Sequence, residues 1–171
     1  YWNIAPDQDA TFTPRYFTER GFMLTGEYRF ITRRTVGQLD FDYMHDDTKT
    51  GDTRFHYRFA HTAQFTPRWS SQFLIDRVSD DQYFQDFSNS LASASRQYLR
   101  SKYGFYGSGR HWQLRTYIDD FQVVDDAVDP LNKPYTRLPR VVFDLDQPLG
   151  FQGLGILLDA ELVHFDRDIG V

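Results

Sequence analysis

Apolar and polar residues alternate with a period of two along most of this chain. Between residues 22 and 32, Leu24 and Phe30 fall on one parity, while Glu27 and Arg29 fall on the other. Successive side chains of a strand point to opposite faces of a sheet, so this spacing predicts a β-strand with one apolar face. Comparable patterns predict further strands at about 8–18, 36–44, 54–65, 68–78, 91–106, 112–123, 138–148 and 154–165.

The stretches between these strands carry turn-forming residues. Two connections, 79–90 and 125–137, are longer than the others. Strands joined in sequence by turns form antiparallel hairpins, so we predict an all-β, up-and-down arrangement of about nine or ten long strands. The sequence contains no linker rich in Gly or Ser, and we expect residues 1–171 to form a single segment. Turn signals lie at 19–21, 49–52, 66–67, 107–109 and 150–153.

Charged residues are confined to one parity in the five clearest strands. No Asp, Glu, Lys or Arg falls on the apolar parity of 22–32, 39–43, 55–65, 139–147 or 154–164. In a membrane barrel, the opposite parity would face the lumen. The residues predicted there are Glu27, Arg29, Asp40, Asp42, Arg54, Arg58, Arg140, Asp144, Asp146, Asp159 and Glu161.

Strand length and aromatic content favour a membrane barrel over a soluble sandwich, although alternation alone fits both. The predicted strands run about 10 to 14 residues, whereas soluble strands cluster near 5 to 6. The chain combines 16 Phe, 11 Tyr and 3 Trp with a mean hydropathy of −0.59. Many of these aromatic residues lie toward strand ends, as in an interfacial girdle. We therefore predict an incomplete, antiparallel transmembrane β-barrel segment.

Two alternatives remain open at this point. The first is a soluble β-sandwich that binds carbohydrate through exposed aromatic residues such as Trp69, Trp112 and Tyr117. The second is an unrelated outer-membrane porin. Solubility without detergent would favour the sandwich, and the sequence upstream of Tyr1 would distinguish the porin.

No pattern in the sequence indicates catalysis, a metal site or a cofactor. The absence of cysteine excludes disulfides, zinc–thiolate sites and a cysteine nucleophile. His56 and His61 are five positions apart and so point to opposite faces of a strand. The carboxylate pairs 40/42 and 144/146 each share a face, but a wetted polar wall explains them better than acid–base chemistry. The net charge of −5, with basic and acidic residues mixed, argues against binding nucleic acid.

Pro14 interrupts an otherwise alternating stretch. Proline has no backbone N–H to donate to a strand ladder, so it is expected at an edge, a bulge or a strand start. A functional interpretation is also available, because a deliberately weakened strand pairing would suit an open seam in a barrel.

Several segments together resemble the LptD family, which assembles lipopolysaccharide at the outer membrane of Gram-negative bacteria. The match begins at 1–6 and 10–16 and covers nearly the whole chain in the same order. The opening stretch is the most specific. Further matching segments are 20–21, 27–30, 39–43, 78–80, 83–87, 121–123 and 135–139.

The resemblance implies that the chain is the N-terminal part of a large outer-membrane β-barrel. Such a barrel follows a periplasmic β-jellyroll that receives lipopolysaccharide from the periplasmic Lpt bridge, and an LptE-like lipoprotein plugs its lumen. Lipopolysaccharide then leaves sideways into outer-membrane lipid, through a seam between the first and last strands. The disulfides of the family would lie outside this cysteine-free segment.

The resemblance also suggests which residues form the lateral gate. Prolines in the first strands are thought to loosen the seam, and Pro14 looks like one of them, whereas its companion would lie just before Tyr1. Because the pattern starts and stops within strands, we expect the chain to be a fragment with two open edges. The predicted gate residues are Tyr1, Trp2, Asn3, Pro6 and Pro14.

Overall fold

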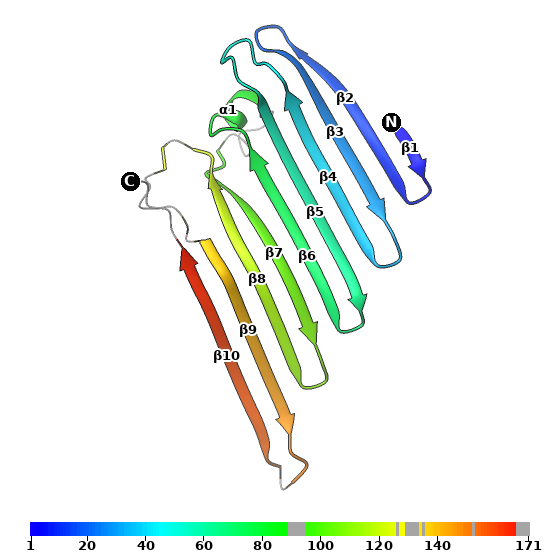
Figure 1. The fold of residues 1–171 in the computed structure, drawn as a ribbon, viewed down its shortest axis with the longest axis vertical. Helices are drawn as coiled ribbons and strands as arrows, with labels where there is room; N and C mark the ends of the chain where they lie inside the picture. Colours follow the sequence, from blue (N-terminus) through cyan, green and yellow to red (C-terminus); the bar gives the residue numbers. More distant parts are fainter. Residues whose placement is uncertain (89–94, 126, 129–133, 135, 152, 167–171) are drawn as a thin grey trace.

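A computed structural model describes the chain except for residues 89–94, 126, 129–133, 135, 152 and 167–171. Ten antiparallel strands form one sheet in which every strand pairs with its sequence neighbours. The sheet is not closed into a barrel, and β1 and β10 lie at its two edges (Figure 1). The predicted all-β, up-and-down segment of about nine or ten strands is therefore confirmed.

The strand bounds follow the predicted alternation closely. In chain order they are β1 (Trp2–Ala5), β2 (Gln8–Phe17), β3 (Gly21–Ile31), β4 (Thr35–Met44), β5 (Arg54–Thr66), β6 (Trp69–Val78), β7 (Tyr98–Ser108), β8 (Trp112–Val123), β9 (Thr136–Pro148) and β10 (Gly155–Asp166). Apart from β1, each strand has 10 to 13 residues, the length expected of strands that cross a bilayer at a tilt.

The predicted start of β7 was wrong, and a short helix was not predicted. The strand predicted at 91–106 begins only at Tyr98; residues 95–97 are not strand, and 91–94 lie outside the described residues. A short helix, α1 (Tyr83–Phe87), occupies the β6–β7 connection. Five residues are too few to show helical periodicity, and this helix depends on burying Tyr83, Phe84 and Phe87 against the sheet.

The register brings the charged parities of successive strands onto one face. Glu27 lies opposite Asp40, Asp40 opposite Arg58, and Arg58 opposite Asp76. Residues directly opposite one another in a sheet point to the same side, so these side chains form a row. The pairs Leu74↔Lys102, Lys102↔Asp119, Tyr117↔Arg140 and Asp144↔Asp159 continue this face to β10. We call it the polar face and the other the apolar face.

The apolar face carries exposed aromatic and aliphatic side chains, with rings folded over glycines. Phe12, Gly26 and Phe41 are opposite one another on three neighbouring strands, and the two rings meet edge to face with centroids 6.5 Å apart. A Cβ at Gly26 would lie 2.3 Å from the Phe41 ring. Glycine here makes room for the ring that covers it. In the part of the chain that the structure describes, no helix has the length and apolar character to span a membrane.

The main hydrophobic cluster lies at one end of the polar face. We call this the loop end, because it carries the long β4–β5, β6–β7 and β8–β9 connections (Figure 1). Tyr83 of α1 donates a hydrogen bond of 3.0 Å to Oδ2 of Asp42, which places the helix over the polar face. The buried members of the cluster are Met23, Met44, Val78, Tyr83, Phe84, Phe87, Leu99 and Val124.

Candidate functional site

The first strand is attached weakly to the sheet. β1 has four residues and pairs with β2 only at Trp2↔Ala10, Asn3↔Asp9 and Ala5↔Gln8, with an irregularity between Asn3 and Ala5. The tight turn that follows contains Pro6. The side chain of Trp2 is 59% exposed. Few ladder bonds therefore hold this edge.

Pro14 lies within β2, opposite Leu24 of β3, in an unbroken register. It is therefore neither at a bulge nor at a strand start. The backbone N–H of Ile31 bonds the carbonyl of Asp7 at 2.9 Å, and in an antiparallel pair every second residue makes such bonds. The odd-numbered residues of β2 therefore bond β3, and the backbone of Pro14 points away from β3. A residue with a backbone N–H at position 14 would therefore donate on the other side of β2, the side on which β1 pairs with it.

The polar side of this edge contains a groove of about 540 Å³. Among the residues that line it are Asn3, Asp9, Arg29 and Gln38, which follow one another across β1 to β4. The guanidinium of Arg29 donates two hydrogen bonds of 2.9 Å to the carboxylate of Asp9. Tyr1 and Pro6 also line the groove. The structure thus brings three predicted gate residues beside a predicted lumen residue.

The other two predicted gate residues lie on the opposite side. Trp2 is paired with Ala10, and Pro14 has the same parity as Ala10 and Phe12, so both belong to the apolar face. The edge therefore presents polar groups on one side and aromatic groups on the other.

Ion pairs between neighbouring strands cover much of the polar face. Arg140 donates to Glu161 at 2.6 Å and to the Tyr117 hydroxyl at 2.5 Å, while Arg115 donates to Asp144 at 2.7 Å. Asp42 accepts hydrogen bonds from neighbouring hydroxyls, including that of Thr25 at 2.6 Å. These carboxylates are thus occupied by cross-strand donors, and the arrangement suits a wetted wall.

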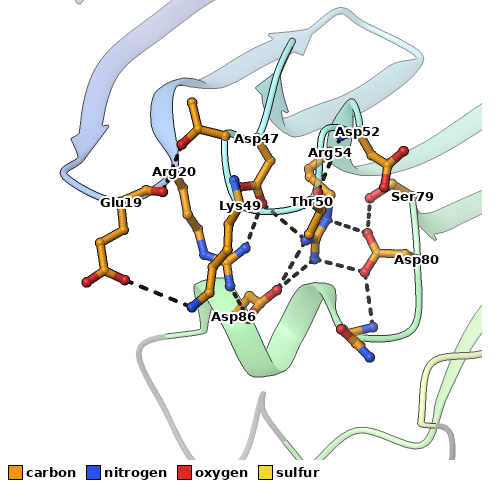
Figure 2. Close-up of polar contacts among 12 residues, drawn as sticks. Glu19, Arg20, Asp47, Lys49, Thr50, Asp52, Arg54, Ser79, Asp80 and Asp86 are labelled. Atoms are coloured by element: carbon orange, nitrogen blue, oxygen red, sulfur yellow. Dashed lines mark hydrogen bonds and ion pairs between the residues drawn. The ribbon is translucent and has the colours of Figure 1, made fainter.

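Arg54 shares the polar parity but is only 3% exposed. It lies at the centre of a network that we call the Arg54 clasp: Arg20, Asp47, Arg54, Asp80 and Asp86 (Figure 2). Arg54 contacts Asp47 at 3.3 Å, Asp80 at 2.6 Å and Asp86 at 3.1 Å. Arg20 contacts Asp47 at 2.6 Å and also pairs with Asp86. The clasp therefore ties the β2–β3, β4–β5 and β6–β7 connections together.

The clasp is stabilised by aromatic contacts and by its buried charges. The guanidinium carbons of Arg20 and Arg54 lie 5.2 and 5.1 Å from the centre of the Phe87 ring. Burial by itself raises the pKa of the Asp47 carboxyl. The backbone N–H of Lys49 and the guanidinium groups of Arg20 and Arg54 outweigh burial and hold this pKa below its ordinary value.

The β6–β7 pairing is completed by side chains near the clasp. β6 continues to Val78, but its register with β7 ends at Leu74↔Lys102. Beyond that point, Ser101 Oγ accepts from the N–H of Asp76 at 3.2 Å and donates to its carbonyl at 3.4 Å. The side-chain amide of Gln122, on β8, bonds the N–H and the carbonyl of Val78 at 3.1 and 2.8 Å. The backbone of β6 thus keeps its partners where β7 diverges.

An ion pair lies on the apolar face, beside the point where β6 and β7 diverge. Arg77 of β6 and Asp120 of β8 pair across β7. Neither this pair nor the clasp was predicted from the sequence. A sequence signal for the clasp was present in the acidic residues of the loops, among them the adjacent residues Asp80 and Asp81.

Comparison with known proteins decides the family. A sequence model described as "LPS transport system D" matches residues 52–170. The chain belongs to the LptD family. The LPS-assembly protein LptD of Nitrosococcus oceani is 38% identical over 168 residues, which cover 98% of this chain and 23% of the relative. Those of Nitrosomonas eutropha and Xanthomonas euvesicatoria are 36% and 34% identical, again over 98% of this chain, and it covers 24% and 21% of them.

The chain thus spans about a fifth to a quarter of the LptD relatives that it matches. Membership of the LptD family excludes an unrelated porin, and the single sheet excludes a sandwich of two packed sheets. The carbohydrate site considered above is also divided, because Trp69 and Trp112 contact each other on the apolar face while Tyr117 contacts Arg140 on the polar face. Both alternatives to an LptD segment are therefore wrong.

Proposed function

We propose that this chain is the N-terminal part of the β-barrel of an LptD-type lipopolysaccharide translocon in the Gram-negative outer membrane. In this proposal the apolar face contacts membrane lipid and the polar face lines the lumen. The observation that carries it is the separation of charge between the two faces of an open sheet of long strands, interrupted on the apolar face by the Arg77–Asp120 pair, in a chain of the LptD family. Lipopolysaccharide needs an apolar route for its acyl chains and a wet route for its saccharide, and two such faces supply both.

The lateral exit is assigned to the β1–β2 edge. Its support is the short, irregular β1 and the missing donor of Pro14 on the β1 side of β2. In the whole protein this edge would adjoin the last barrel strand, and a poorly bonded seam opens at low cost because few hydrogen bonds must be broken. Asn3 and Arg29 would meet the saccharide on one side, while Trp2 and Pro14 would meet acyl chains on the other.

The partners follow from the same assignment. An LptE-like lipoprotein would occupy the lumen against the polar face, and lipopolysaccharide would arrive from the periplasmic Lpt bridge through a domain that precedes this segment in the full-length protein. The chain's contribution to transport is non-covalent: carboxylates such as Asp144 and Glu161 are engaged in cross-strand pairing, and moving a lipid requires no covalent bond to be made or broken.

Site-specific photo-cross-linking in the full-length protein tests the proposal. Gln38→p-benzoylphenylalanine places the probe on the polar face beside the edge groove, and Phe59→p-benzoylphenylalanine places it on the apolar face. During active export we expect the first to capture lipopolysaccharide, and the second to capture phospholipid. Capture of lipopolysaccharide at neither position during measured export would overturn the proposal.

A further inference from the structure

A second groove, of about 390 Å³, lies on the polar face between β5, β6 and β7, away from the β1–β2 edge. Ala60 and Leu74 form a small, apolar floor, since they lie opposite one another on β5 and β6. Three cations surround it: Arg58 from β5, and Arg100 and Lys102 from β7. Strands two apart in a sheet are about 10 Å from each other, so long side chains on β5 and β7 can reach one ligand above β6.

The cations of this groove are accessible, whereas two of the three acids nearest to them, Asp76 and Asp119, are buried. The third, Asp40, lies opposite Arg58 and is 35% exposed. The side chains of Arg58 and Arg100 are 44% and 48% exposed, but Asp119, the partner of Arg100, is fully buried. The carboxylate of Asp76, opposite Arg58, is likewise buried and contacts His56 at 2.9 Å. A buried carboxylate cannot contact a ligand, so a ligand in the groove meets the exposed cations before it meets Asp76 or Asp119.

Two of the cations are only loosely engaged. Arg58 approaches Asp40 no closer than 3.9 Å, beyond the range of a hydrogen bond. The ammonium group of Lys102 lies 4.5 Å from the centre of the Tyr117 ring and has no acidic partner within 4.0 Å among the residues that the structure describes. These charges therefore remain available to an anion, in contrast to Arg115 and Arg140, which bond carboxylates directly.

We propose that this groove binds the phosphate monoester of a phosphorylated sugar headgroup. A guanidinium fork and an ammonium group on either side of a small floor suit the tetrahedral oxygens of a phosphate. Gln72 and Thr62, which also line the groove, supply an amide and a hydroxyl for sugar hydroxyls. The inference rests on the proposed function, because it supposes that lipopolysaccharide passes over the polar face. It adds a binding site on the polar face, away from the proposed exit at the β1–β2 edge.

The test uses the full-length protein, with its plug, in proteoliposomes. Leu74→p-benzoylphenylalanine places a photoreactive group on the floor of the groove. The probes are a lipid A with two phosphates and the same lipid after enzymatic dephosphorylation. We expect cross-linking to the phosphorylated probe to be about tenfold greater, the factor given by charge-assisted hydrogen bonds. Inorganic phosphate at millimolar concentration should compete only weakly, whereas complete competition would assign the site to free phosphate instead.

Single substitutions distinguish binding in the groove from a general effect of positive charge on the polar face. Arg58→Gln and Lys102→Gln should each lower the yield several-fold, and Lys102→Arg should restore it. Arg115→Gln is the matched control, because Arg115 is also 48% exposed on the polar face but lies outside the groove. Equal loss with all three glutamine variants, equal capture of the two probes, or capture of the plug protein in place of lipid would each overturn the inference. If Leu74→p-benzoylphenylalanine captures no lipid while Gln38→p-benzoylphenylalanine still does, the proposed function stands without this binding site. If neither variant captures lipid, the proposed function is overturned as well.

Discussion

Arg54 donates two hydrogen bonds of 3.1 Å to Oδ2 of Asp86, a residue 32 positions further along the chain. This pair holds the short helix α1 over the loop end of the polar face. Arg54 is 3% exposed, so its charge is compensated by Asp47, Asp80 and Asp86 and not by water.

Removing one member of the clasp should therefore be costly. We expect Asp86→Ala in the full-length protein to lower the free energy of unfolding by about 3 kcal/mol, because it removes a carboxylate that both Arg54 and Arg20 contact. The measurement is urea unfolding in detergent, combined with limited proteolysis of the α1 segment. Asp144→Ala breaks an exposed pair and should cost less than about 1 kcal/mol. Equal costs would show that the clasp contributes no more than a surface pair.

Replacing Pro14 should strengthen the seam. In the full-length protein, Pro14→Val restores a backbone donor on the edge of β2 that points away from β3, and one ladder hydrogen bond to a strand paired at that edge is worth about 1 kcal/mol. We expect export of lipopolysaccharide to slow several-fold, measured as the rate at which labelled lipid reaches the cell surface. The control is Thr13→Val, because the backbone of Thr13 already bonds β3. Unchanged delivery with Pro14→Val would refute the gate assignment.

A charge on the apolar face should oppose membrane insertion. Tyr57 is on this face, next to Arg58 on the polar face. We expect Tyr57→Arg to cost about 2 to 4 kcal/mol in folding into lipid bilayers, the range for a mid-bilayer arginine on a barrel exterior. Thr62→Arg, on the polar face, is the control and should be tolerated. If both variants insert equally well, the apolar face does not contact lipid.

The stability contributed by Asp47 should depend on pH. Its pKa in the folded protein is held below the ordinary value, so the folded state favours the ionised form. The contribution is therefore fully present above the unfolded-state pKa of about 3.9 and is lost as pH falls through the lower folded-state value. Urea unfolding of the wild type and of Asp47→Asn between pH 7 and pH 3 should show a gap that narrows below about pH 4. A gap independent of pH would contradict this.

Adding a methyl group at Gly26 should disturb the ring above it. Its Cβ would lie 2.3 Å from Phe41, so the ring has to rotate away from Phe12. We expect Gly26→Ala to cost about 1 to 3 kcal/mol, as other overpacked sites do. In a double-mutant cycle, Phe41→Leu should remove most of this penalty. Simple additivity of the two substitutions would mean that the ring does not press on Gly26.

Pro14 shows what could be predicted from the sequence and what required the structure. The sequence identified a proline inside an alternating stretch and offered a bulge, a strand start or a weakened pairing. Only the register showed that its backbone points away from β3, because the direction of a backbone group depends on which residues the neighbouring strand places opposite. The family resemblance, by contrast, was available from short local segments and is confirmed by the relatives.

The alternating pattern alone was enough to predict most of the strands and their two faces. Alternation is a local property, and a strand with charges on one parity has one polar face whatever its neighbours are. The tertiary structure alone decided how Arg54 meets Asp86, how Gln122 completes β6 from β8, and how α1 covers one end of the polar face. These contacts join residues separated by 32, 44 and 41 positions, and no local period encodes them. They require the strands to be paired and the loops to lie at a common end of the sheet.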